Sequence, residues 1–62
     1  MPAIRAGERW QITLEGMPRS VVVIAETDTA GWWQCVDVQT GIQFLAREQW
    51  FVDRELVDSN DV

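Results

Sequence analysis

The sequence consists of short runs of β-branched and aromatic residues, and turn-forming residues separate each run from the next. Residues 8–14 alternate strictly, so that Trp10, Ile12 and Leu14 share one face of an extended strand. Residues 20–27 contain a continuous aliphatic stretch that is typical of a central strand. No segment has the apolar periodicity of a helix of useful length. These runs restrict the chain to a small all-β domain.

Turn residues set the expected limits of the strands. We expect a loop over residues 15–19, because Gly16 permits a positive φ and Pro18 cannot donate to a ladder. A second turn is expected at residues 28–31, and a tight hairpin turn ends at Gly41. The tail from Asp53 is acidic, and we expect most of it to fray. The predicted strands are residues 8–14, 20–27, 32–38, 42–46 and 50–52, with one short 3-10 turn at residues 47–49.

A chain of 62 residues has few ways to stabilise its fold. A domain of this size buries only about 60% of the surface that its unfolded chain exposes. Cys35 is the single cysteine and there is no histidine, so a disulfide and a zinc site are both excluded as supports. The hydrophobic fraction of 47% and the four tryptophans must therefore supply the core, or the chain must self-associate.

Five short strands in a meander, with a long first loop and a single turn before the last strand, resemble the SH3-like small barrel. The resemblance includes an opening Gly7-Glu8-Arg9 segment, a distal turn ending in Gly41, and an aromatic residue after the helical turn. It implies an all-β, five-stranded SH3-like barrel with one short 3-10 turn before the last strand. An OB-like barrel is the second choice. The expected division is an N-terminal arm at residues 1–6, the barrel at residues 7–53 and an acidic, flexible tail at residues 54–62.

The adjacent residues Trp32 and Trp33 are the strongest indication of function. On a strand they point to opposite faces, and a small barrel has no second layer to cover its outside. One register places Trp33 and Cys35 inside. The other places Trp32 and Val36 inside, and leaves Trp33, Cys35 and Asp37 outside. We favour the second register, with Trp33 exposed, because it keeps the carboxylate of Asp37 in water.

The outer indole can be covered in three ways. The tail residues Leu56 and Val57 can fold back over it, a second copy of the chain can bury it, or a different protein can bind it. Exposed apolar patches usually mark interfaces, and both of the last two alternatives are interfaces.

Charge and residue types exclude several functions. The net charge is −5, which opposes a general nucleic-acid binder. Cys35 has no histidine partner, and there is no glycine loop for a phosphate, so we expect no enzyme, no catalytic residue, no metal and no cofactor. No segment has the length of a membrane span, and the N-terminus lacks an apolar signal core. We therefore expect a cytoplasmic protein from a bacterium or a phage.

One more specific resemblance is to the plasmid-type (type II) dihydrofolate reductases, which are SH3-like barrels that form a tetramer around a central pore. The segments that carry it are Gly7-Glu8-Arg9, Val23-Ile24, Gly31-Trp32-Trp33-Gln34-Cys35 and Gly41-Ile42-Gln43-Phe44-Leu45. The family's pore-lining tyrosine corresponds to Leu45, and its functional lysine would fall near Ile12 in a chain that has no lysine. The resemblance implies an oligomeric barrel that binds NADPH.

The sequence favours a non-enzymatic protein-interaction or assembly module with an exposed, acidic, tryptophan-containing surface. The expected partner is another protein or a second copy of the chain. The expected contact residues are Trp33, Asp37, Gln43, Arg9 and Arg47.

Two alternatives remain for the function. The first is a nucleic-acid-related barrel, either a single-strand binder in which Trp33 stacks on bases beside Arg9, Arg19 and Arg47, or an acidic mimic of nucleic acid. The second is an oligomer similar to the type II dihydrofolate reductases.

Overall fold

The structure is a computed structural model, and it describes residues 4–55. Its five strands form one antiparallel sheet in the order β4-β3-β2-β1-β5. The elements are β1 (Arg9–Leu14), β2 (Met17–Glu26), β3 (Trp32–Asp37), β4 (Gln43–Arg47), the 3-10 turn η1 (Glu48–Trp50) and β5 (Phe51–Glu55). The predicted all-β class, the number of strands and the 3-10 turn before the last strand are confirmed.

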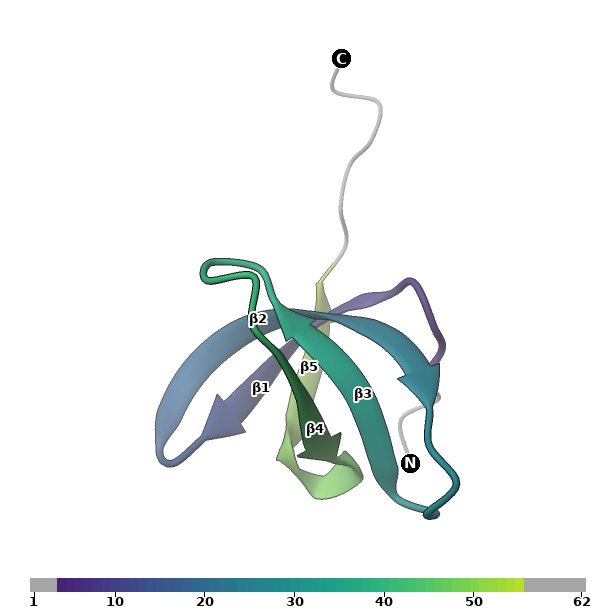
Figure 1. The fold of residues 1–62 in the computed structure, drawn as a ribbon. Helices are drawn as coiled ribbons and strands as arrows, with labels where there is room; N and C mark the ends of the chain where they lie inside the picture. Colours follow the sequence, from purple (N-terminus) through teal and green to yellow (C-terminus); the bar gives the residue numbers. More distant parts are fainter. Residues whose placement is uncertain (1–3, 56–62) are drawn as a thin grey trace.

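The sheet is strongly curved. In Figure 1, β2 arches across the molecule, with β3 and β4 in front of β1 and β5. The β1–β5 register shifts between Gln11 and Ile12, and the β2–β3 register shifts between Val23 and Ala25. Irregularities of this kind bend a strand and increase its local twist. The concave face of the sheet therefore surrounds a core, and the convex face is left outside.

All five strands contribute side chains to the core. Trp10 of β1 meets Phe51 of β5 edge to face, with ring centroids 5.6 Å apart and planes at 79°. Ile4, which the sequence division places in an N-terminal arm, is also buried. Four larger residues pack at the margin of the core, namely Leu14, Trp33, Phe44 and Trp50. The buried hydrophobic residues are Ile4, Trp10, Ile12, Val21, Val23, Cys35, Ala46 and Phe51.

The first connection is a tight turn, and the prediction of a loop over residues 15–19 is wrong. Glu15 has φ 53° and Gly16 has φ 80°, which suits a two-residue hairpin, and β2 begins at Met17. Pro18 lies within β2 opposite Thr13, one pair beyond the pair that closes the turn. Such a position is not hydrogen-bonded to β1. On the other side of β2, backbone hydrogen bonds begin at Ser20, whose carbonyl accepts from the N–H of Val38 at 3.0 Å. The absence of an N–H group at Pro18 therefore removes no hydrogen bond between β2 and a neighbouring strand.

Glu8 joins the segment before β1 to the sheet. Its Oε1 accepts from the indole N–H of Trp10 at 3.1 Å and from the backbone N–H of Arg5 at 3.0 Å. Its Oε2 accepts from Nη1 of Arg54 at 3.1 Å. The hydrogen bond from Trp10 is the largest cause that holds the pKa of Glu8 below its usual value.

The last strand extends beyond its predicted end. Most of the tail from Asp53 was expected to fray, but β5 continues to Glu55, and all of its residues except Val52 pair with β1. At its end, Nε of Arg9 lies 2.9 Å from Oε1 of Glu55. The remaining tail, which holds Leu56 and Val57, lies outside the described residues.

Candidate interaction surface

The two faces of β3 separate the adjacent tryptophans, as predicted, but the favoured register is wrong. Cys35 is fully buried and Asp37 is only 6% exposed, so both lie on the concave face. Trp33 is half-buried and packs against the core from this face. Trp32 lies on the convex face, opposite Arg47 of β4. The register that places Trp33 and Cys35 inside is therefore the one that the protein adopts.

Asp37 can be buried because its carboxylate has partners on every side. Its Oδ1 accepts from the backbone N–H of Gln39 at 2.8 Å and from that of Thr40 at 3.2 Å. Its Oδ2 lies 3.3 Å from Nη1 of Arg19. The turn itself closes when the N–H of Gly41 donates to the carbonyl of Asp37 at 2.8 Å. A carboxylate with these contacts avoids most of the cost of burying an unpaired charge.

Cys35 is a core residue, and its predicted place on the exterior is also wrong. Its Sγ lies 3.8 Å from the carbonyl oxygen of Trp33. Burial raises the pKa of the thiol to about 11, so that the thiol is neutral at pH 7. In this form Cys35 packs as a small apolar side chain.

We expect the Cys35 thiol to react with iodoacetamide at pH 8 at least 100-fold more slowly in the native protein than in urea. The reagent can reach the thiolate only after a local or global opening, which is rare in a folded core. The unfolded thiol ionises near 9.0, below the folded value of about 11, so stability should fall as pH rises through this interval. The chain has no lysine or tyrosine to titrate in the same interval.

The Cys35→Ala variant is the control for this prediction. It should lose both the labelling and the decline in stability between pH 9 and pH 11. Equal labelling rates in native and denatured protein would show that Cys35 is accessible.

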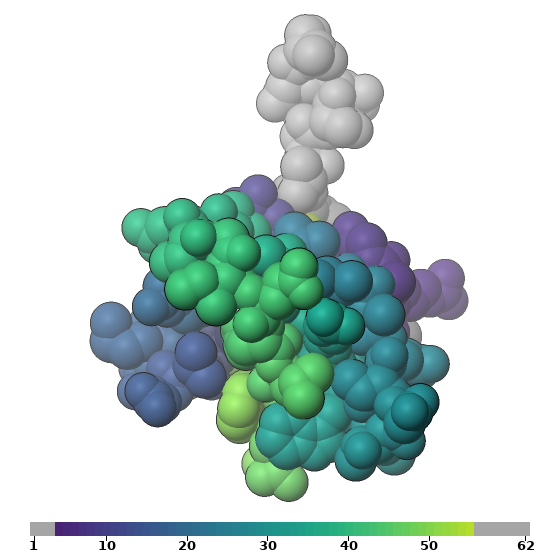
Figure 2. All heavy atoms as spheres, in the orientation of Figure 1, coloured from purple at the N-terminus to yellow at the C-terminus, as the bar shows by residue number. Residues whose placement is uncertain are grey.

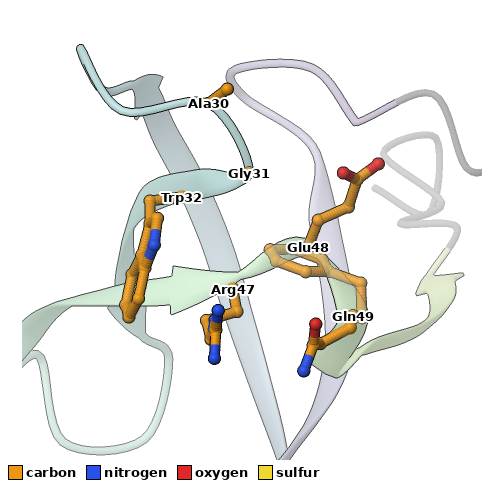
Figure 3. A pocket seen from close by; sticks show the side chains of 7 residues that line it. Ala30, Gly31, Trp32, Arg47, Glu48 and Gln49 are labelled. Carbon is orange, nitrogen blue, oxygen red and sulfur yellow. The ribbon is translucent and has the colours of Figure 1, made fainter.

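Trp32 and Arg47 on the convex face form a compact group with Trp50 of η1, which also packs against the core, and we call this group the Trp32 cluster. The guanidinium Cζ of Arg47 lies 5.1 Å from the centroid of the Trp32 ring, within the range of a cation–π interaction. Trp50 of η1 meets Trp32 edge to face, with centroids 6.1 Å apart and planes at 71°. Figure 3 shows Trp32 and Arg47 projecting side by side from β3 and β4.

An open pocket of about 390 Å³ lies beside the Trp32 cluster. The carbonyl of Gly31 accepts from the backbone N–H of Glu48 at 2.8 Å, which joins the start of β3 to η1. In Figure 3 the carboxylate of Glu48 points to the opposite side from the indole of Trp32. The pocket thus has an indole and a guanidinium on one side and polar groups on the other. Its lining consists of Ala30, Gly31, Trp32, Arg47, Glu48, Gln49 and Phe51.

The structure does not bring the five predicted contact residues together. Trp33 and Asp37 face the core, and Arg9 is paired with Glu55 across β1 and β5, at the end of the sheet away from β4. Gln43 and Arg47 share the convex face of β4, where Gln43 accepts from Nε2 of Gln34 at 3.0 Å. The sequence analysis placed Trp32 outside only in the register that it did not favour, and it did not predict the contact between Trp32 and Trp50.

The expected nucleic-acid platform is not assembled either. Two of its three arginines are held in ion pairs, Arg9 with Glu55 and Arg19 with Asp37. The stacking residue of that hypothesis, Trp33, packs against the core and does not lie beside Arg47 on the convex face. These contacts disfavour a single-strand binding surface.

Comparisons with known proteins identify no relative. No protein-family model matches the chain, and no curated protein or solved structure matches it. Within residues 4–55, no group of three His, Cys, Asp or Glu side chains is placed to hold a metal ion. No helix in the same part of the chain has the length and apolar character to cross a membrane. The resemblances to SH3-like barrels and to type II dihydrofolate reductases remain expectations from the sequence.

Proposed function

We propose that the protein is a non-enzymatic interaction or assembly module, and that the Trp32 cluster is its contact surface. The observation that carries the proposal is the guanidinium of Arg47 stacked on Trp32 beside an open pocket. Tryptophan and arginine are the residues most enriched at the energetic centres of protein interfaces. The strand order and the 3-10 turn before β5 support an SH3-like barrel as the scaffold. The buried free thiol of Cys35 is compatible with a cytoplasmic location.

The cluster favours a partner that offers an apolar side chain next to a carboxylate. Arg47 belongs to none of the ion pairs within residues 4–55, which join Arg9 to Glu55, Arg19 to Asp37 and Arg54 to Glu8. Its guanidinium can therefore donate two hydrogen bonds to a carboxylate of a partner in a bidentate contact. The indoles of Trp32 and Trp50 provide apolar area beside it at a small cost in side-chain entropy.

The test is capture of a partner from the native host with wild-type protein, Trp32→Ser and Arg47→Gln. Loss of a central tryptophan typically costs about 2 kcal/mol or more, so Trp32→Ser should bind the captured partner roughly 30-fold more weakly. Titration calorimetry with the purified partner measures this change.

Val38→Ser is the matched control, because Val38 is an exposed apolar residue that follows the end of β3 opposite to Trp32 and does not line the pocket. It should bind like the wild type. Equal binding by Trp32→Ser, with its circular dichroism unchanged, would contradict the proposal.

A further inference from the structure

We infer that the protein forms a two-fold symmetric dimer, in which β4 pairs antiparallel with β4 of a second copy. The inference goes beyond the proposed function, because it names a second copy as the partner and uses the backbone of β4, which shares only Arg47 with the Trp32 cluster. It rests on the direction of the β4 backbone groups, on the side chains that a two-fold axis would bring together, and on the contrast between the two edges of the sheet.

β4 has one paired side and one open side. It is the edge strand next to β3, and no other strand of residues 4–55 pairs with it. On the paired side, the carbonyl of Ile42 accepts from the N–H of Asp37 at 2.9 Å, and the N–H of Glu48 donates to the carbonyl of Gly31. Backbone direction alternates along a strand, so Gln43, Leu45 and Arg47 direct their N–H and C=O groups away from β3. An open edge of this kind is a template for another strand.

With a two-fold axis at Leu45, all the outward-directed N–H and C=O groups of Gln43, Leu45 and Arg47 would form hydrogen bonds with the second copy. This axis would pair Leu45 with Leu45 of the second copy, and Gln43 with Arg47 of the second copy. In an antiparallel ladder each such pair exchanges two hydrogen bonds, which gives about six new bonds across the interface. The three residues with open backbone groups are centred on Leu45, so a symmetric pairing centred elsewhere would leave some of them unused.

The side chains of β4 are complementary to those of β4 in the second copy when the two strands are related by this axis. On the convex face, Leu45 is 52% exposed and would meet its own copy, while the amide of Gln43 would lie opposite the guanidinium of Arg47. On the concave face, the large ring of Phe44 would lie opposite the small side chain of Ala46. No like charges oppose one another. An isologous interface requires this kind of self-complementarity.

The surroundings of β4 leave room for a second copy. Figure 2 shows the atoms of β4 and of the preceding turn at the front of the molecule, uncovered by the other described residues. Beside the strand lies an apolar hollow of about 330 Å³, with Leu14, Phe44 and Trp50 among its walls. Ile42, which is 63% exposed, lies at the same edge.

The other edge strand carries features that oppose such pairing. Three of the five residues of β5 are charged, namely Asp53, Arg54 and Glu55. A two-fold axis at the centre of β5 would place Asp53 against Asp53 of the second copy. Charged side chains on an edge strand prevent edge-to-edge association. Within β4 the only charge is Arg47, at the end of the strand, and its centre is a leucine.

The test uses the fact that residue 45 would face itself. Wild-type protein should sediment as a monomer–dimer mixture whose dimer fraction rises with concentration. Leu45→Lys and Leu45→Glu should each be monomeric, because each would place two like charges at the axis. An equimolar mixture of the two variants should dimerise again, since an ammonium would then face a carboxylate.

Val52→Lys is the matched control, because it places the same charge on an exposed residue of the other edge strand. It should keep the dimer. A wild-type protein that is monomeric up to millimolar concentration, a dimer that survives Leu45→Lys, or a mixture that stays monomeric would each overturn the inference.

Amide hydrogen exchange tests the register directly. At a concentration about tenfold above the dissociation constant, the amides of Gln43, Leu45 and Arg47 should exchange several-fold more slowly than in dilute protein. The amides of Phe44 and Ala46 already donate to β3 and should change less. Uniform slowing of all five would contradict the proposed edge.

The Trp32→Ser variant separates this inference from the proposed function. It should keep the dimer, because the pairing is made by the backbone of β4 and by Leu45 at the axis, whereas the Trp32 indole stacks on Arg47 at the end of the strand. Loss of the dimer in this variant would assign self-association to the Trp32 cluster and overturn the β4 edge. A failure to capture another protein would contradict the proposed function and leave the dimer measurements unaffected.

Discussion

Trp33→Ser is expected to lower the free energy of unfolding by about 3 kcal/mol, and Trp32→Ser by about 1 kcal/mol. Trp33 packs against the core from the concave face, so its loss would leave a void and place a hydroxyl group beside apolar side chains. Trp32 contributes a cation–π contact and an aromatic edge contact at the surface. A 62-residue domain has a total stability of only about 3–9 kcal/mol. The Trp33 variant should therefore lose from about a third to all of this stability, and it should unfold at a clearly lower urea concentration than the wild type.

Urea denaturation followed by far-ultraviolet circular dichroism measures both changes. The wild type and both variants should show similar slopes of free energy against urea concentration, since the surface exposed on unfolding changes little. Equal losses in the two variants would show that Trp32 and Trp33 are equally important to the core.

Asp37→Ala is expected to cost about 3 kcal/mol, the second large effect. It would leave the N–H groups of Gln39 and Thr40 without their acceptor and would remove the buried carboxylate that pairs with the part-exposed guanidinium of Arg19. Asp37→Asn keeps an acceptor oxygen in the place of Oδ1 and should cost about 1 kcal/mol.

The comparison of the two Asp37 variants separates the turn from the charge. Thermal unfolding of both, at matched protein concentration, provides the measurement. If Asp37→Asn were as damaging as Asp37→Ala, the ion pair with Arg19 would be the dominant contribution, and the turn hydrogen bonds would contribute little.

Local patterning was sufficient for most of the secondary structure. The alternation in residues 8–14 and the aliphatic run of β2 each predicted a strand that is present. The turn at Glu15–Gly16 was missed, because Pro18 was taken as part of a loop, although at its position in β2 no neighbouring strand needs a backbone N–H. The extension of β5 to Glu55 was missed because the acidic residues from Asp53 were interpreted as a solvent-exposed tail. In the structure, Arg9 of β1 forms an ion pair with Glu55 of β5. Both errors concern partners that are distant in the sequence.

The candidate site depended on a register that local patterning did not determine. The alternation of Trp32 and Trp33 was predicted, but the choice between the two faces depended on whether Asp37 could be buried. The sequence from Asp37 to Gly41 contains a signal that it could, because an aspartate at the start of a turn often accepts from the backbone two residues later. Once the register is known, Arg47 falls opposite Trp32, and the Trp32 cluster follows.

The length of β2 determines whether parts of the sheet can unfold separately. This single strand pairs with β1 through residues 17–22 and with β3 through residues 21–26, so the two halves of the sheet share it. If β2 detaches at one end, either the β1–β2 hairpin or the β2–β3 pair loses part of its partner strand. An isolated two-stranded pair is only marginally stable in water. Fragments of the chain that divide β2 should fail to fold separately, and the intact chain should melt in one all-or-none step.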